Sequence, residues 1–230
     1  MTASKKTSGF TLVELLVTLA VSAVIMTAVY AAYQSQQRSY VTQEEVAALQ
    51  QNLRVAMFYM SNQIREAGCN PSETDVNRPG ILTAEVGEIN FTSDIRGSSF
   101  GTEPDGKTDG PYENITYDLF TSDGIQSLGI QNTSGATRQA VIENVAALNF
   151  VYLDQNGNVL DDGSGTVTTN ISNIRAVEVT IVVRASREDP HYTDVGAYEN
   201  RQREVVLTAP NDHFRRKMLS MRIACRNLGL

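Results

Sequence analysis

Glu14 is the residue whose type and position most call for a chemical explanation. It is the only charged residue in the 24-residue run from Phe10 to Tyr33. A charged side chain near the centre of a membrane-spanning helix costs about 2.5–3.5 kcal/mol on insertion scales. Either Glu14 stays near the membrane interface, with its carboxylate protonated or reaching water, or a positive group pairs with it.

An ion pair with an amine is the chemistry that would use this carboxylate. No Lys or Arg lies in helical register with Glu14 inside the apolar run, but the α-amino group of Phe10 would serve if the chain were cut just before it. An α-amino group has a reference pKa of about 7.7–8.0, so it is mostly charged at neutral pH. Cleavage before Phe10 would therefore create the missing cation.

The run from Phe10 to Tyr33 is long enough to span a membrane. As a helix it would cover ~36 Å at ~1.5 Å per residue, and a bilayer core of about 30 Å needs roughly 20 apolar residues. Lys5 and Lys6 precede the run, and no Lys or Arg follows until Arg38. Because positive charge stays on the cytoplasmic side, we expect a cytoplasmic N-terminus and an exported remainder. A cleaved secretory signal is the alternative, but its apolar core is usually about 7–15 residues long, so we favour a retained anchor.

A single long helix is predicted around this anchor. The chain contains 16 Gly and 6 Pro, yet none of them lies among the 58 residues between Gly9 and Gly68. Residues 10–33 form the apolar, membrane-spanning half, and residues 34–67 form an amphipathic half with apolar residues every three or four positions. These apolar residues are Val46, Leu49, Leu53, Ala56, Met60, Ile64 and Ala67. We expect this stripe to pack onto a sheet, with a coiled-coil seam as the alternative.

Residues 68–230 predict a β-rich globular head. Segments rich in β-branched and aromatic residues alternate there with Gly, Pro, Asn and Asp. The expected strands are Ile81–Phe91, Ile115–Phe120, Arg138–Glu143, Ala147–Asp154, Ile174–Ala185, Arg203–Thr208 and Phe214–Arg226. Asn156-Gly157 indicates a hairpin turn, and residues 94–113 are typical of a long exposed loop. The fold class is therefore α+β, with a long N-terminal helix packed on an antiparallel β-sheet head.

Composition and charge argue against several function classes. The formal net charge is −7, and residues 69–165 carry 4 basic and 15 acidic residues. Binding to nucleic acid, which depends on phosphate contacts, is therefore not expected. His191 and His213 have no Cys or carboxylate at ligand spacing, which argues against a metal site. Asp154 opens a segment like a calcium loop, but Val159 stands where that loop needs Gly. We expect no catalytic constellation, metal or cofactor, and hence no enzyme. Calcium binding in another geometry, at Asp161-Asp162 or at Asp105 and Asp109, stays open as an alternative.

The two cysteines, Cys69 and Cys225, belong to the part of the chain that we expect to be exported. Disulfides form in oxidising compartments, so a disulfide between Cys69 and Cys225 is expected, and two buried, unpaired thiols are the alternative. The bond would tie the end of the long helix to the last strand.

Residues 5–16, Lys-Lys-Thr-Ser-Gly-Phe-Thr-Leu-Val-Glu-Leu-Leu, closely resemble the leader and N-terminus of type IV prepilins. The resemblance implies that residues 1–9 are a leader, that prepilin peptidase cuts between Gly9 and Phe10, and that Phe10 is then N-methylated. It also implies that Glu14 docks on the N-terminal amine of a neighbouring subunit during assembly. Methylation keeps the amine charged, so the ion-pair interpretation holds after this modification.

Parts of the head resemble PilW-type minor pilins, namely residues 64–69, 144–154, 174–179 and 214–228, and the layout is also similar to J-type secretion pseudopilins. Many major pilins carry a proline in the apolar half of the helix, and this chain has none there, which points to a minor pilin or a pseudopilin. The resemblance implies a minor type IV pilin that acts in pilus initiation and assembly. A type II secretion pseudopilin and a tip adhesin, with residues 94–113 as its binding surface, are the alternatives.

The partners and the location follow from the same resemblance. The implied partners are prepilin peptidase, other minor pilins, the major pilin and the inner-membrane assembly platform. The chain is expected as a single-pass protein of the bacterial inner membrane, with a cytoplasmic N-terminus and a periplasmic head, before it enters a pilus or pseudopilus.

Overall fold

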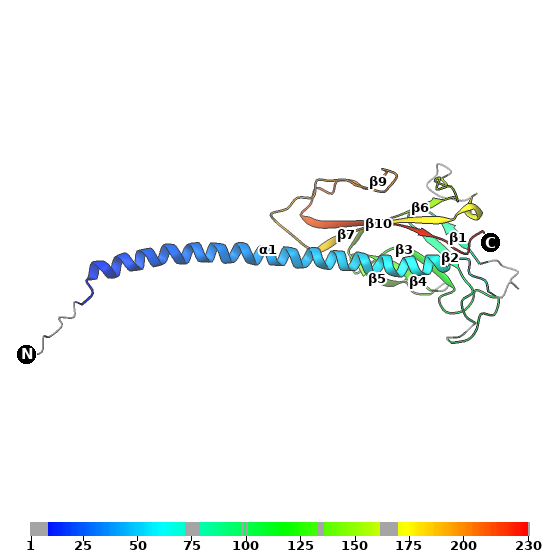
Figure 1. Ribbon diagram of the computed structural model, residues 1–230, viewed down its shortest axis with the longest axis horizontal. Coiled ribbons are helices and arrows are strands. Elements are labelled where there is room, and N and C mark those ends of the chain that lie inside the picture. The colour runs from blue at the N-terminus through cyan, green and yellow to red at the C-terminus, as the bar shows by residue number, and fades with distance from the viewer. Residues whose placement is uncertain are drawn as a thin grey trace, which may run out of the picture. The chain divides into compact units, whose positions relative to one another are not determined.

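The computed structural model describes residues 9–71, 79–97, 99, 101–132, 136–161 and 170–229. The chain divides into two compact units, of which the first runs to Glu45 and the second from Val46 to Leu230. Helix α1 (Leu12–Glu66) contributes to both units, and every strand in the described part of the chain belongs to the second (Figure 1).

Helix α1 is the long helix predicted from the run without Gly or Pro. It begins after Thr11, whose hydroxyl accepts a hydrogen bond from the first turn, and it ends where Gly68 adopts a φ of 80°. A Cβ at Gly68 would also lie 2.5 Å from Leu228 Cδ2. The position therefore favours glycine for its left-handed backbone, and a larger residue would also displace the end of the Leu228 side chain.

The amphipathic half of α1 buries one face in the second unit. Its buried side chains are Leu49, Leu53, Ala56, Met57, Met60, Ser61 and Ile64. Ala67, just beyond the helix, is buried too, whereas Val46 is half-buried. This face is the predicted stripe with Met57 and Ser61 added. Its apolar members share a hydrophobic core with the strands, as expected for packing onto a sheet.

A five-stranded antiparallel sheet, in the order β1-β2-β3-β4-β5, forms the first part of the head. Its strands are β1 (Ile81–Ala84), β2 (Ile89–Thr92), β3 (Asn114–Ser122), β4 (Ile125–Gln131) and β5 (Gln139–Glu143). The prediction of one strand over Ile81–Phe91 is wrong, because the Glu85 N–H donates to the Glu88 carbonyl and folds this segment into a hairpin. The sequence pattern also missed β4, which follows β3 through Asp123 and Gly124, both at positive φ as a two-residue hairpin turn requires.

A three-stranded antiparallel sheet in the order β10-β7-β6 forms the second part. Its strands are β6 (Val145–Leu153), β7 (Ala176–Glu188) and β10 (Phe214–Ala224), and the short 3-10 helix η1 (Ile171–Asn173) precedes β7. The predicted central strand is β7, and the predicted terminal strand is β10. Since β6 and β10 are edge strands, each has only one strand partner in this sheet.

The segment that joins β7 to β10 carries a small hairpin, β8 (Tyr198–Glu199) with β9 (Val205–Leu207). Arg216 holds the ends of this segment together, since its guanidinium donates to Asp212 at 2.6 Å and to Asp194 at 3.1 Å. The side chains of Arg216 and Asp194 are 6% and 4% exposed. Arg215 adds a second pair with Asp189 at 2.7 Å.

One hydrophobic core joins the second half of α1 to the two larger sheets. Its largest fully buried side chains include Tyr117, Phe91, Phe150, Met57 and Met60. Burying a large apolar side chain contributes about 1.5–3 kcal/mol to stability. The architecture is therefore the predicted α+β fold, although the described strands divide into three sheets where a single sheet was expected.

Candidate functional site

The first turn of α1 contains a reciprocal set of hydrogen bonds between Thr11 and Glu14. The Thr11 N–H and the Thr11 hydroxyl both donate to Glu14 Oε2 at 2.9 Å, and the Glu14 N–H donates back to Thr11 Oγ1 at 3.3 Å. This is a capping box, in which Thr at the N-cap and Glu three residues later satisfy each other's backbone groups. The carboxylate of Glu14 is thus directed toward the beginning of the helix.

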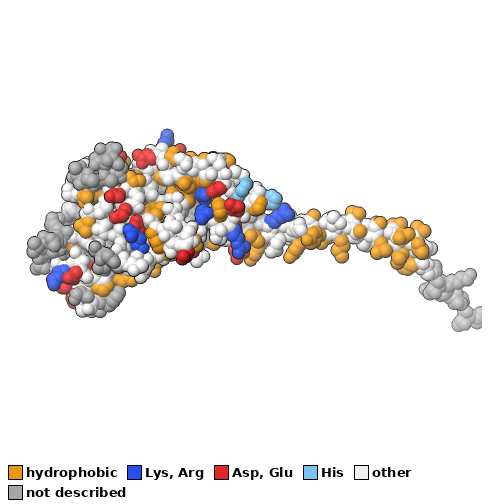
Figure 2. Space-filling model, turned by 180° about the vertical axis from the view of Figure 1, so that it is seen from behind, with side chains coloured by type: hydrophobic (Ala, Val, Ile, Leu, Met, Phe, Trp, Pro, Cys, Tyr) orange, Lys and Arg blue, Asp and Glu red, His pale blue; other side chains and the backbone are white. Residues whose placement is uncertain are grey.

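Exposed apolar side chains surround this carboxylate. Phe10 is 85% exposed, Leu12 is 74% exposed and Val13 is 67% exposed. No side chain from Phe10 to Tyr33 is buried or half-buried, and Figure 2 shows hydrophobic side chains covering this stretch of the helix on the face drawn. Glu14 is therefore a single negative charge on an apolar helical surface that the rest of the chain does not cover.

Helix α1 is also the one helix among the described residues that is long and apolar enough to cross a membrane. The predicted processing residues, Gly9 and Phe10, lie just before it and are exposed. The leader charges Lys5 and Lys6 lie outside the described residues. The prediction missed Thr11, although the Thr-x-x-Glu spacing of a capping box was readable in the sequence.

The expected disulfide between Cys69 and Cys225 is not formed, and both residues are free cysteines. Cys225 is buried, and burial raises the pKa of its thiol to about 12. The end of α1 is linked to the C-terminal segment by noncovalent contacts instead. The side-chain amide of Asn227 donates to the carbonyls of Arg65 and Glu66 at 3.2 and 3.4 Å.

Residues 94–113, expected as an exposed loop, contain two carboxylates that are completely buried. Glu113 Oε1 accepts hydrogen bonds from the backbone N–H groups of Ile95 and Arg96, and Glu113 Oε2 accepts one from Gly110. Asp94 Oδ2 accepts a hydrogen bond from the Gly106 N–H. The loop is therefore organised from within by two acidic side chains, while several of its residues, such as 101–103, remain exposed.

The segment that begins like a calcium loop is a turn closed by its own carboxylate. Asp154 Oδ1 accepts hydrogen bonds from the N–H groups of Asn156 and Asn158, both at 2.8 Å. The Asn158 side-chain amide also donates to Asp154 Oδ2 at 2.9 Å, and this hydrogen bond, together with those from the backbone, lowers the pKa of Asp154. Within the described residues, no three His, Cys, Asp or Glu side chains are grouped so as to hold a metal ion.

Comparison with known proteins gives matches to two family models and similarity to solved structures. Residues 4–30 match the prokaryotic N-terminal methylation motif, and residues 119–227 match the type IV pilus-assembly protein W family. A type IV-like pilin from Thermus thermophilus is 13% identical, with a TM-score of 0.48 over 79% of this chain and 98% of its own. A search of curated proteins found no match.

Proposed function

We propose that the chain is a PilW-like minor pilin of the type IV prepilin family that takes part in pilus assembly, and that the segment Gly9–Glu14 carries its assembly chemistry. Prepilin peptidase cuts between Gly9 and Phe10, Phe10 is N-methylated, and Glu14 docks on the N-terminal amine of a neighbouring subunit. The neighbours are other minor pilins and the major pilin, brought together by the inner-membrane assembly platform.

The observation that carries this proposal is the position of the Glu14 carboxylate. It is exposed, it is the only charge between Phe10 and Tyr33, and it lies in the first turn of α1. In an apolar environment an unpaired carboxylate is costly, and a nearby cation offsets that cost. An ion pair with a free N-terminal amine would therefore lower the cost of placing this carboxylate in the membrane. The same ion pair would select a partner whose amine is free.

The capping box supplies the geometry for docking. Both recorded hydrogen bonds from Thr11 go to Glu14 Oε2, which leaves Oε1 to accept a hydrogen bond from an incoming amine. A charge-assisted hydrogen bond of this kind is roughly twice as strong as one between neutral groups. Thr11 thus holds the carboxylate in one orientation without occupying both of its oxygens.

The same proposal sets the orientation of the chain. The leader with Lys5 and Lys6 lies in the cytoplasm, residues 10–33 cross the inner membrane, and the head lies in the periplasm until the subunit enters the filament. The excess of positive charge before the apolar run favours this direction of insertion.

Mass spectrometry of the mature N-terminus from cells tests the processing step. We expect a chain that begins with N-methylated Phe10. An intact Met1, or cleavage near residue 33, would contradict the proposal.

The docking step is tested by Glu14→Gln, which keeps the size of the side chain and one acceptor oxygen and removes its charge. We expect normal cleavage but at least about tenfold less incorporation into filaments, because removing one partner of a buried ion pair leaves the other charge unpaired. Glu44→Gln, a change of the same type at an exposed position of the same helix, is the matched control and should leave incorporation unchanged. Normal incorporation of the Glu14→Gln subunit would refute the docking role.

A further inference from the structure

The outer edge of β6 is covered at two points by other parts of the head. The Phe150 N–H donates to the carbonyl of Val86, in the turn between β1 and β2, at 2.8 Å. Two residues further on, the Tyr152 carbonyl accepts a hydrogen bond from the Leu160 N–H, also at 2.8 Å. These contacts partly complete an edge strand whose one neighbour among the described strands is β7.

Between these two points the edge of β6 is interrupted. In an antiparallel ladder the N–H and C=O of one residue point to the same side, so the Phe150 carbonyl and the Tyr152 N–H point to this outer edge as well. Outside the regular strand ladders, no backbone hydrogen bond between described residues reaches either group. Unpaired edge groups are a template for another strand, and here they flank Val151.

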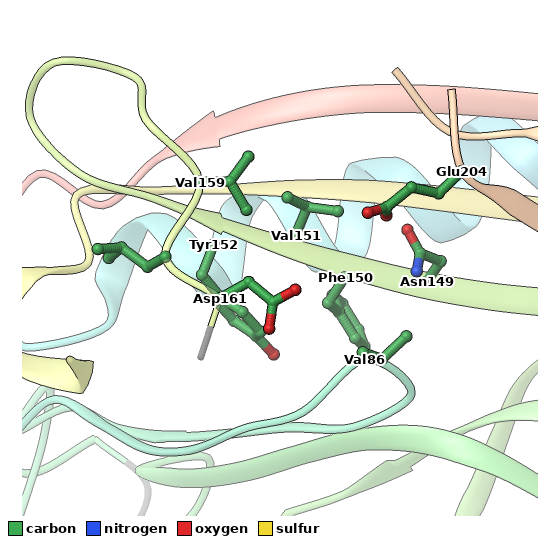
Figure 3. A pocket seen from close by; sticks show the side chains of 9 residues that line it. Val86, Asn149, Phe150, Val151, Tyr152, Val159, Asp161 and Glu204 are labelled. Atoms are coloured by element: carbon green, nitrogen blue, oxygen red, sulfur yellow. The ribbon is translucent and has the colours of Figure 1, made fainter. Parts of the chain in front are cut away.

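A cleft lies at the same place. It is shallow, with a volume of about 40 Å³, and its apolar walls include Val86, Val151 and Val159 (Figure 3). Val86 and Val159 are 43% and 46% exposed. Exposed apolar residues grouped around a cleft mark surfaces that bind other molecules.

Two carboxylates give the cleft its charge. Asp161 and Glu204 both line it, from segments 43 residues apart in sequence, and their side chains approach it from either side of Val151 (Figure 3). Both residues are exposed. The Asn200 side-chain amide donates to Glu204 Oε2 at 2.9 Å and fixes the orientation of that side chain. The cleft therefore combines apolar walls with negative charge.

We propose that this cleft, formed by the β6 edge, Val86, Val159, Asp161 and Glu204, binds an extended segment from the head of a neighbouring pilin subunit. One residue of that segment, paired in parallel with Val151, would donate to the Phe150 carbonyl and accept from the Tyr152 N–H. The side chain of this residue would point to the same face of the sheet as Val151 and Glu204, so we expect it to be Lys or Arg. The side chain of the following residue would point to the opposite face, where we expect an apolar contact with Val86. The identity of the partner as a pilin rests on the function proposed above.

The experiment places a photoreactive amino acid at position 159 of the full-length chain in cells that make the filament. Position 195 is the matched control, because Val195 is also an exposed valine, at 69%, and does not line the cleft. We expect an adduct at 159 with another subunit that carries a prepilin motif, mapped to an extended head segment containing Lys or Arg. It should be at least about fivefold more abundant than any adduct at 195.

Charge variants then test recognition. Asp161→Asn with Glu204→Gln should lower the yield of the adduct at 159 about tenfold, since the complementary charge is lost while side-chain size is kept. Glu103→Gln, an exposed acidic residue of the 94–113 loop, should leave it unchanged. Circular dichroism of the purified variants must show that the head is folded as in the parent protein. A second substitution, Val86→Thr, should also lower the yield of the adduct at 159, without changing any charge.

Equal adducts at 159 and 195, an adduct only with proteins that lack a prepilin motif, or a yield insensitive to these substitutions would overturn the inference. Its failure is separable from failure of the proposed function. If Phe10 is processed and Glu14→Gln blocks incorporation while no adduct forms at 159, the cleft does not bind a subunit and the proposed function stands. If Phe10 is not processed, the proposed function fails whatever the adduct shows.

Discussion

Helix α1 is apolar in both of its halves, but only the second half buries apolar side chains within the chain. In the first unit, Ile25 is 56% exposed and Met26 is 71% exposed, and the side chains around them are exposed as well. In the second unit, Met60 and Ile64 are fully buried. The difference shows that the described chain leaves the apolar surface of the first half uncovered, whereas the second half belongs to a self-contained core. Under the proposed function, a membrane or other subunits cover that surface.

Charged side chains follow the same division. Glu14 in the first unit interacts with Thr11, three residues away. In the second unit, Arg216 on β10 reaches Asp194, which lies 22 residues earlier, and both side chains are buried. We infer that the second unit carries the conformational stability of the protein, whereas the assembly chemistry proposed above lies in the first unit.

Among the variants that test this division between the two units, Arg216→Ala is expected to change the free energy of unfolding most. Removing Arg216 leaves Asp194 as a buried carboxylate without its cation, which typically costs about 3–5 kcal/mol. The free energy of unfolding should fall by that amount in urea titrations of the full chain in detergent micelles. Because the chain contains no Trp, unfolding is followed by the near-ultraviolet circular dichroism of its tyrosines.

Arg38→Ala is the corresponding change in the first unit and should alter this free energy by less than about 0.5 kcal/mol. If the two arginine variants were equally destabilised, the division of stability between the two units would be wrong.

A second prediction compares one residue type in the two halves of the same helix. Ile64→Ala should destabilise the protein by about 2–5 kcal/mol, since it removes a fully buried side chain and leaves a cavity. Ile25→Ala should leave head unfolding unchanged within about 0.5 kcal/mol, because Ile25 touches no core. A cost for Ile25→Ala similar to that for Ile64→Ala would show that the first half is packed within the chain after all.

The helix and the central strand could be predicted because each depends on local sequence. The absence of Gly and Pro over 58 residues allows one long helix, and the β-branched residues of 176–183 favour a central strand. β4 could not be found this way, because polar residues and Gly129 interrupt its pattern. Gly129 is needed there for a tertiary reason, since a Cβ would lie 2.8 Å from Phe120 Cδ1 on the neighbouring strand.

The candidate site divides in the same manner. Glu14 was identified from its charge alone, and Thr11 could have been, because a capping box is a local pattern. The β6 cleft could not be predicted, since Val86 and Val151 lie 65 residues apart in sequence and meet only in the fold. The disulfide was predicted from the compartment alone, and no local pattern reports whether two thiols are bonded.

A third prediction concerns acid. The hydrogen bonds from Arg215 and Arg216 lower the pKa values of Asp189 and Asp212 below the usual 3.8. The stability from these pairs is fully present above about pH 4 and is lost as the pH falls through the lower pKa values of the folded state. Arg215→Gln should therefore flatten the loss of stability between about pH 4 and pH 2, measured by urea titration at each pH. Arg38→Ala should follow the parent protein, and an unchanged slope in Arg215→Gln would contradict the assignment to Asp189.

The smallest effect is expected from Thr11→Val, which keeps the shape of the side chain and removes the hydroxyl of the capping box. Loss of an N-cap side chain costs about 0.5–2 kcal/mol. Here the cost should be confined to the first turn, because the hydrogen bonds of Thr11 within the described chain go to Glu14 and the helix start. Amide hydrogen exchange in micelles should accelerate at residues 12–14 and stay unchanged from residue 46 onward, and Thr11→Ser should restore protection. Since the head does not rely on this turn, its urea midpoint should not move. A shift of that midpoint would mean that the first turn of α1 contributes to the stability of the second unit. The proposed division, with assembly chemistry in the first unit and conformational stability in the second, would then be wrong.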